Sequence, residues 1–225
     1  MRREIILTND GSHTIAVPER NVTYHSVHGA IQESQHVFIK AGLLESGIFD
    51  TTGVHRVLEA GLGTGLNALL TLIEADKHKN RIHYTAIEPF PPDESVIKKL
   101  NYCKQLNLPH YQRLFEKMHQ CGWEEMCEIT HCFRLTKHNT TLQEFSSDEA
   151  YSIVYYDAFA PAAQPELWTK EIFDKLYSLM AEGGLLVTYC SKGDVRRAMI
   201  AAGFSVKKIP GPPGKREMIR AIKPG

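Results

Sequence analysis

The sequence predicts an α/β protein with a doubly wound, mostly parallel sheet, extended at its amino terminus by a small β-hairpin and a helix. From residue 54 onward, short runs of apolar and β-branched residues alternate with stretches of helical periodicity. A glycine-rich turn, Gly61–Gly65, joins the first of these runs directly to a helical stretch. Before residue 54, the turn formers Asn9–Ser12 separate two β-branched runs, which is typical of a hairpin.

The local pattern of apolar residues and turn formers places each element. In the extension, strands are expected at 4–8 and 14–17 and a helix at 26–42. The expected strands of the main sheet are 56–60, 82–87, 133–135, 151–156, 185–189, 204–209 and 217–222. The expected helices between them are 66–74, 94–106, 165–181 and 195–202. The segment 108–128 carries no clear pattern, so no element is predicted there.

The composition is typical of one globular domain, since 43% of the 225 residues are apolar and 23% are charged. We predict a single structural domain in which an extension at 1–53 packs on a core at 54–225. Basic and acidic residues number 26 each, so the chain lacks the positive charge of a protein that grips long nucleic acid. Neither a signal peptide nor a bilayer-spanning segment is recognisable, so we expect a cytoplasmic protein with no membrane partner.

The five cysteines are an odd number and form no C-x-x-C pair, which favours reduced thiols over a disulfide framework. One cluster contains zinc-ligand residue types, but its spacing fits no usual zinc module. Its members are His119, Cys121, Cys127, His131 and Cys132. We therefore expect no metal site.

The glycine-rich turn has the composition of a cofactor loop. Gly61, Gly63 and Gly65 permit a tight turn and a close approach of a ligand to the backbone. A dinucleotide fingerprint would need glycine where Leu66 stands. Glu59 would repel a pyrophosphate, but it would attract the positive amino group and sulfonium of S-adenosylmethionine (SAM). These features favour a Rossmann-like SAM-dependent methyltransferase sheet.

Glu88, followed by Pro89, stands at the carboxyl end of the second core strand. A carboxylate there can accept hydrogen bonds from both ribose hydroxyls of a bound nucleoside. The alternative is a βα turn that serves packing alone, with Glu88 solvated.

Asp157 ends the strand 151–156, at the edge of the sheet that faces the cofactor methyl. Methyl transfer to nitrogen needs a free lone pair, yet a primary alkylamine has a pKa of about 10.4 and is protonated at neutral pH. Asp157 is suited to bind the ammonium form and take its proton. Tyr24, Phe159 and Trp168 would wall the pocket and stack on a flat base. The alternative is that Asp157 caps its loop and the aromatic rings belong to the core.

Several stretches together resemble the MnmC-like tRNA methyltransferases, called MnmD when they stand alone. These stretches are Tyr24–Ser26, Gln32–Ile39, Glu59–Asn67, Asp157–Pro161 with Pro165–Thr169, and Gly214–Met218. The resemblance implies that SAM methylates the primary amine of 5-aminomethyluridine, with or without 2-thiolation, at the tRNA wobble position.

The loop and the resemblance together indicate the site residues. Asp157 is the expected catalytic residue. The expected cofactor-binding residues are Glu33, Glu59, Gly61, Gly63, Thr64, Gly65, Asn67, Glu88 and Pro89. The expected substrate-binding residues are Tyr24, Phe159, Pro161, Trp168, Lys215 and Arg216.

The expected partner is the tRNA anticodon loop, whose wobble base can be splayed into a pocket. Lys215, Arg216 and Arg220, with Arg196 and Arg197, would hold phosphates of the anticodon stem. Bifunctional members of the family carry an FAD-dependent oxidase domain that produces the amine. This chain shows no such domain, so we expect no FAD and an amine supplied by another enzyme or pathway.

The sequence departs from the family at Ala162–Gln164, where a lysine and an asparagine are usual, and at Pro212–Pro213, where glycine and an aromatic residue are usual. Substrate contacts would differ at these two places. Three other functions stay open: a small-molecule methyltransferase, an aminopropyltransferase that uses decarboxylated SAM, and a non-enzymatic RNA-binding module on a SAM-binding fold.

Overall fold

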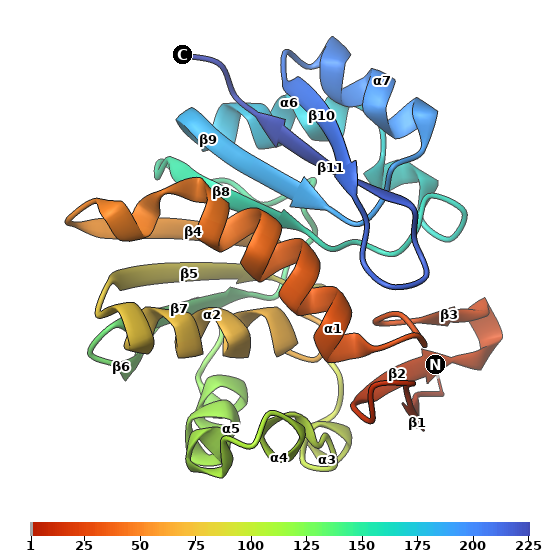
Figure 1. Cartoon of the computed structure of the whole chain (residues 1–225), viewed down its shortest axis with the longest axis vertical. Helices are drawn as coiled ribbons and strands as arrows, with labels where there is room; N and C mark the ends of the chain where they lie inside the picture. The colour runs from red at the N-terminus through yellow and green to blue at the C-terminus, as the bar shows by residue number, and fades with distance from the viewer. Residues whose placement is uncertain (1) are drawn as a thin grey trace.

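The computed structural model describes residues 2–225, which form an eight-stranded sheet flanked by helices and a smaller three-stranded sheet beside it (Figure 1). The order in the large sheet is β10-β11-β9-β8-β4-β5-β7-β6. Its strands are β4 (Val54–Ala60), β5 (Arg81–Ile87), β6 (Met126–Thr130), β7 (Phe133–His138), β8 (Tyr151–Tyr156), β9 (Met180–Thr188), β10 (Ser205–Pro210) and β11 (Glu217–Ile222). The strands from β9 to β7 are parallel, and antiparallel pairing begins at β6 and β11.

Helices pack on both faces of this sheet. In Figure 1, α1 and α2 lie on the near face and α6 lies on the far face. The helices are α1 (Ala30–Ser34), which continues as a π-helix at Gln35–Leu43, α2 (Leu66–His78), α3 (Glu94–Ile97), α4 (Tyr102–Gln105), α5 (Gln112–Gln120), α6 (Lys170–Leu179) and α7 (Gly193–Ala201). The predicted fold class, a doubly wound α/β sheet of the SAM-dependent methyltransferase type, is confirmed.

The two faces are built by the alternation of side chains along each strand. Ile153 and Tyr155 of β8 enter the core that also contains residues of the π-helix and α2. Val154 and Tyr156 enter the second core, with residues of α6 and α7. β8 is therefore buried on both sides, which explains its nearly continuous apolar sequence.

The amino-terminal extension contains the predicted hairpin, with β1 (Glu4–Leu7), β2 (His13–Val17) and a two-residue strand β3 (Val22–Thr23). Residues 30–48 contribute to the same hydrophobic core as the strands and helices after residue 54. The division at residue 53 stays a prediction.

Three predicted helices differ from the structure. The predicted helix 94–106 is two short helices, because Asn101 bonds across to the hairpin: it accepts from the His13 amide (2.8 Å) and donates to the Gly11 carbonyl (2.8 Å). The helix 26–42 begins only at Ala30 and becomes a π-helix at Gln35. The helix 165–181 begins at Lys170 and ends at Leu179, because Met180 pairs with β8 as the start of β9.

The segment 108–128, in which no element was predicted, contains α5 and the start of β6. It also contains a disulfide between Cys121 and Cys127, whose Cα atoms lie 6.2 Å apart across a short turn. The prediction of reduced thiols is therefore wrong for these two residues. Cys103, Cys132 and Cys190 are free, as predicted, and all three are buried. No helix within residues 2–225 is both long and apolar enough to cross a membrane.

Candidate active site

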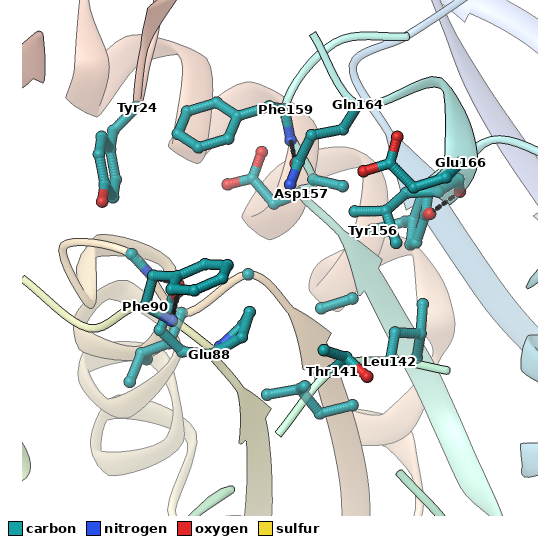
Figure 2. A pocket seen from close by; sticks show the side chains of 18 of the residues that line it. Tyr24, Glu88, Phe90, Thr141, Leu142, Tyr156, Asp157, Phe159, Gln164 and Glu166 are labelled. Atoms are coloured by element: carbon teal, nitrogen blue, oxygen red, sulfur yellow. Dashed lines mark hydrogen bonds between the residues drawn. The ribbon is translucent and has the colours of Figure 1, made fainter. Parts of the chain in front are cut away.

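A cavity of about 270 Å³ opens at the carboxyl ends of the central strands (Figure 2). Four loops line it: 61–63 after β4, 88–90 after β5, 141–143 after β7 and 157–159 after β8. The amino-terminal extension closes its outer side with residues that include Arg3, Arg20 and Tyr24. The cavity therefore lies where a doubly wound sheet places its ligands.

The glycine loop needs glycine at two positions. Gly61 has a φ of +98°, and a Cβ atom there would lie 2.7 Å from the carbonyl oxygen of Asp157. Gly63 has a φ of +50°, and its Cβ would lie 2.9 Å from the ring of Tyr24. The loop is thus pressed between the start of the β8 loop and the amino-terminal extension, which leaves its backbone facing the cavity.

Glu88 is buried and clamps the glycine loop. Its two carboxylate oxygens accept hydrogen bonds from the backbone amides of Gly63 and Phe90, each at 2.9 Å. Burial raises the pKa of this carboxyl above its ordinary value, and the two amide bonds oppose that rise. Each oxygen keeps a further lone pair, so Glu88 can still accept the two hydroxyls of a ribose.

Asn67 joins two carboxylates beneath the loop. Its side-chain Nδ2 donates to Glu59 Oε1 and to Asp157 Oδ2, both at 2.8 Å. Desolvation raises the pKa of Asp157 to about 7 and that of Glu59 well above its ordinary value. Asp157 is therefore poised to exchange a proton near neutral pH.

Two buried acceptors in this network, Glu59 Oε2 and Asn67 Oδ1, form no hydrogen bond of standard geometry among residues 2–225, and the donor nearest to Glu59 on its other side is the buried Tyr84 hydroxyl. A buried polar atom without a partner is costly, so these atoms match a ligand that brings donors. The α-ammonium of SAM is such a group, because it has three N–H donors and a positive charge that Glu59 and Asp157 would attract. Together with Glu88, the residues present fit SAM.

An ion pair lies behind Asp157. The Nζ of Lys215 is 2.6 Å from Oε1 of buried Glu33 and stands 3.9 Å from the ring centroid of Tyr189. The other Glu33 oxygen accepts from the Ser26 amide at 2.7 Å. Glu33 raises the pKa of Asp157 and Lys215 lowers it, both less than desolvation does. Lys215 belongs to the loop between β10 and β11, so this loop reaches the site.

Aromatic rings form part of the wall. Tyr24 and Phe159 meet edge to face at 5.2 Å, and both line the cavity. Trp168 is buried behind them: its Nε1 donates to the Phe159 carbonyl at 2.8 Å, and its ring packs on Tyr156 at 4.9 Å. Trp168 therefore supports the Phe159 loop from the core and does not line the cavity.

Apart from Trp168, the predicted site residues fall into three groups according to their position relative to the cavity. Gly61, Gly63, Glu88, Pro89, Tyr24, Phe159 and Asp157 line the cavity. Glu33, Glu59, Asn67 and Lys215 form the polar network next to Asp157. Thr64, Gly65, Pro161 and Arg216 lie outside the cavity lining. Thr64 is buried with its hydroxyl 2.8 Å from His25 Nε2, and the binding roles assigned to this third group stay predictions.

Sequence reasoning missed the loop 141–143, the exposed Phe90, and Arg3 and Arg20 of the extension. For the loop 141–143 and for Phe90, the place in the sequence was a signal, because a loop that follows a core strand lies at the edge of the sheet where ligands bind. No group of three or more His, Cys, Asp or Glu side chains within residues 2–225 is arranged to hold a metal ion.

Comparison with known proteins identifies relatives that match most of the chain. The model of a family described as "S-adenosyl-L-methionine-dependent methyltransferase" matches residues 99–224, more than half of the sequence. The tRNA 5-methylaminomethyl-2-thiouridine biosynthesis bifunctional protein MnmC of Paraburkholderia xenovorans is 30% identical over an alignment of 208 positions, and the match covers 87% of this chain and 31% of the relative. The corresponding protein of Cupriavidus metallidurans is 31% identical, over 96% of this chain and 33% of the relative. The chain thus spans about a third of the length of these curated relatives.

Solved structures agree on the fold. The crystal structure of MNMC2 from Aquifex aeolicus superposes with a TM-score of 0.80 at 24% identity, covering 98% of this chain and 70% of that one. Spermidine synthase from Thermotoga maritima superposes with a TM-score of 0.56 at 14% identity, covering 100% of this chain and 69% of that one. At these sequence identities the superpositions support the fold and nothing further.

Proposed function

Because this chain belongs to the S-adenosyl-L-methionine-dependent methyltransferase family, we propose that it methylates the primary amine of 5-aminomethyluridine, 2-thiolated or not, at the tRNA wobble position. The observation that carries the proposal is Asp157, which faces the cavity with a pKa near 7 and is held by Asn67. The curated relatives are tRNA 5-methylaminomethyl-2-thiouridine biosynthesis proteins, and this activity supports the choice of substrate class.

The chain's own residues would hold SAM along one side of the cavity. Glu88 would accept its ribose hydroxyls, and Glu59 with Asn67 would accept its α-ammonium. The bound cofactor supplies a methyl group on a positively charged sulfur, which makes that carbon electrophilic.

Asp157 would prepare the attacking nitrogen. The substrate amine arrives as an ammonium ion, because its pKa lies near 10.4. Ionised Asp157 attracts this ion and accepts one proton from it, which frees the nitrogen lone pair. The lone pair then forms the N–CH3 bond while the S–CH3 bond breaks and its electron pair remains on sulfur. The proton on Asp157 returns to solvent, and the product leaves as a secondary ammonium ion.

Phe159 and Tyr24 would exclude water from the reacting atoms and support the flat base. We also propose that the amine is supplied by a separate enzyme activity and that the reaction takes place in the cytoplasm, where tRNA is modified.

The direct test is incubation of the purified protein with SAM and tRNA that carries 5-aminomethyluridine, followed by nucleoside mass spectrometry. We expect conversion to 5-methylaminomethyluridine, and no product from tRNA with an unmodified wobble uridine. Decarboxylated SAM in a parallel reaction separates methyl transfer from aminopropyl transfer. If calorimetry shows bound SAM but the modified tRNA gains no methyl group, the proposal is wrong.

A further inference from the structure

Three of the five cations that were expected to hold phosphates of the anticodon stem are paired with carboxylates. Lys215 is paired with Glu33, and Arg220 lies 3.0 Å from Glu45. Arg197 is paired with Asp194 on α7. Each of these cations would have to leave a carboxylate in order to bind a phosphate. Arg196 and Arg216 form no ion pair among residues 2–225, but neither lines the cavity. A cation that has no carboxylate partner and also lines the cavity is better placed to bind a phosphate next to the reacting base.

Arg20 is such a cation, and it lies at the entrance of the cavity. It ends the short 3-10 turn Pro18–Arg20, is exposed, and lines the cavity. Within residues 2–225, Arg20 takes part in none of the ion pairs, so no carboxylate lies within 4.0 Å of its guanidinium. Figure 2 shows Glu166 across the opening from Tyr24, which belongs to the same amino-terminal extension as Arg20; Glu166 is exposed and would repel a phosphate. The entrance is therefore positive on the side of the amino-terminal sheet and negative on the side of the β8 loop.

Phe90 presents an exposed ring on the same side. Its exposed fraction is 57%, which is high for phenylalanine, although Glu88, two residues earlier, is buried. Arg3 holds this loop by donating to the carbonyl oxygens of Phe90 and Pro91. Figure 2 shows Phe90 and Phe159 on opposite walls of the opening, with the Asp157 carboxylate near Phe159. A flat ring that entered between these two walls would point toward Asp157.

We propose that the RNA strand crosses the amino-terminal sheet, so that Arg20 binds a phosphate next to the everted wobble nucleotide and Phe90 stacks on its base. This inference rests on the proposed function and names the surface that recognises the substrate. Proteins that bind single-stranded nucleotides combine an arginine on the backbone with an aromatic ring on the base. The combination occurs here at the entrance of a cavity that contains a proton acceptor.

The test measures tRNA binding by fluorescence anisotropy at several salt concentrations, with the intact protein saturated with SAM. We expect Arg20→Ala to weaken binding about 10-fold and to reduce the slope of log K against log salt by about 1. Arg20→Lys should keep the slope. Arg113→Ala is the matched control, because Arg113 is exposed on α5 away from the cavity and carries the same charge. It should bind tRNA as the wild type does.

Phe90→Ala should weaken tRNA binding by about 5- to 10-fold and leave the SAM dissociation constant unchanged, as measured by calorimetry. A loss of SAM affinity would assign the ring to the cofactor and overturn the stacking role. If Arg20→Ala keeps the wild-type affinity and salt slope, the proposed surface is wrong even when the wild-type enzyme methylates tRNA. Conversely, a wild type that binds tRNA through Arg20 but transfers no methyl group would contradict the proposed function and leave the surface supported.

Discussion

The two sides of the cavity are built differently. On the cofactor side, Glu88, Glu59 and Asn67 are almost fully buried and tied to the glycine loop and to Asp157 by hydrogen bonds of 2.8–2.9 Å. On the substrate side, Arg20 and Phe90 are exposed, and the hydrogen bonds of Phe90 are made by its backbone amide and carbonyl. A small cofactor can be enclosed by a site formed during folding, whereas a tRNA loop needs an open surface. The difference predicts that changes on the two sides affect separate binding constants.

The largest effect is expected where the two sides meet. Asp157→Asn keeps the shape of the side chain but removes the proton acceptor, so kcat should fall by about 10²- to 10⁴-fold. The SAM dissociation constant should change little, as measured by calorimetry. In the wild type, kcat/KM for tRNA should rise as the pH increases through about 7, because Asp157 must be ionised to accept a proton. A variant with full turnover, or with the wild-type pH profile, would exclude this role.

On the cofactor side, Glu88→Gln replaces a carboxylate that accepts two backbone amides. Hydrogen bonds to a charged group contribute about 1.5–3 kcal/mol, so SAM affinity should fall by about 10- to 100-fold. Glu166→Gln is the control, since it makes the same change at an exposed position on the entrance. Calorimetry with SAM should separate the two variants. Equal affinities would show that Glu88 does not bind the cofactor.

Substitution of Asn67 should lower both the affinity for SAM and kcat, each by less than the changes above. Asn67→Ala removes the amide that joins Glu59 to Asp157, so both carboxylates lose a donor. We expect SAM affinity and kcat each to fall by about 5- to 10-fold. An effect on only one of the two constants, measured by calorimetry and single-turnover kinetics, would show that the two carboxylates are held independently.

The smallest expected effect is on the thermal stability of the ligand-free protein. The folded-state pKa of Asp157, about 7, exceeds its ordinary value of 3.8, so its contribution to stability is greatest at low pH and is lost as the pH rises through about 7. Asp157→Asn should therefore raise the Tm of the ligand-free protein at pH 8 by about 2–4 °C, the shift that ~1 kcal/mol produces in a domain of this size. The difference should shrink toward pH 5 in a thermal melt. A difference that stays constant between these pH values would contradict this origin.

Much of the cofactor side could be predicted from the sequence, because its residues follow adjacent parallel strands. Gly61, Gly63 and Glu88 lie together at the ends of β4 and β5, as their positions in the sequence require. The loop 141–143 was missed because β7 is three residues longer than predicted. The end of β7 nearest the cavity contains Lys137. A lysine is usually exposed, so the sequence suggests a loop there, but Lys137 is buried and its Nζ lies 2.8 Å from the His119 carbonyl.

The substrate side was harder to predict because its contacts connect distant parts of the chain. Arg3 reaches the Phe90 loop, and the Tyr24 ring packs on Gly63; neither contact follows from local periodicity. Trp168 could be located by its motif, but the motif does not distinguish a ring that lines a cavity from one that supports it from the core.

The Lys215–Glu33 pair also has a consequence for folding. Its partners are 182 residues apart in sequence, and Glu33 is buried. During synthesis the amino-terminal part of the chain emerges first, so Glu33 lacks its cation until the loop between β10 and β11 has been made and has docked. A buried carboxylate without a partner is unfavourable, so we expect α1 to pack stably in its native position only after that step. We therefore expect the neighbourhood of Asp157 to be among the last regions to acquire protection from hydrogen exchange during refolding.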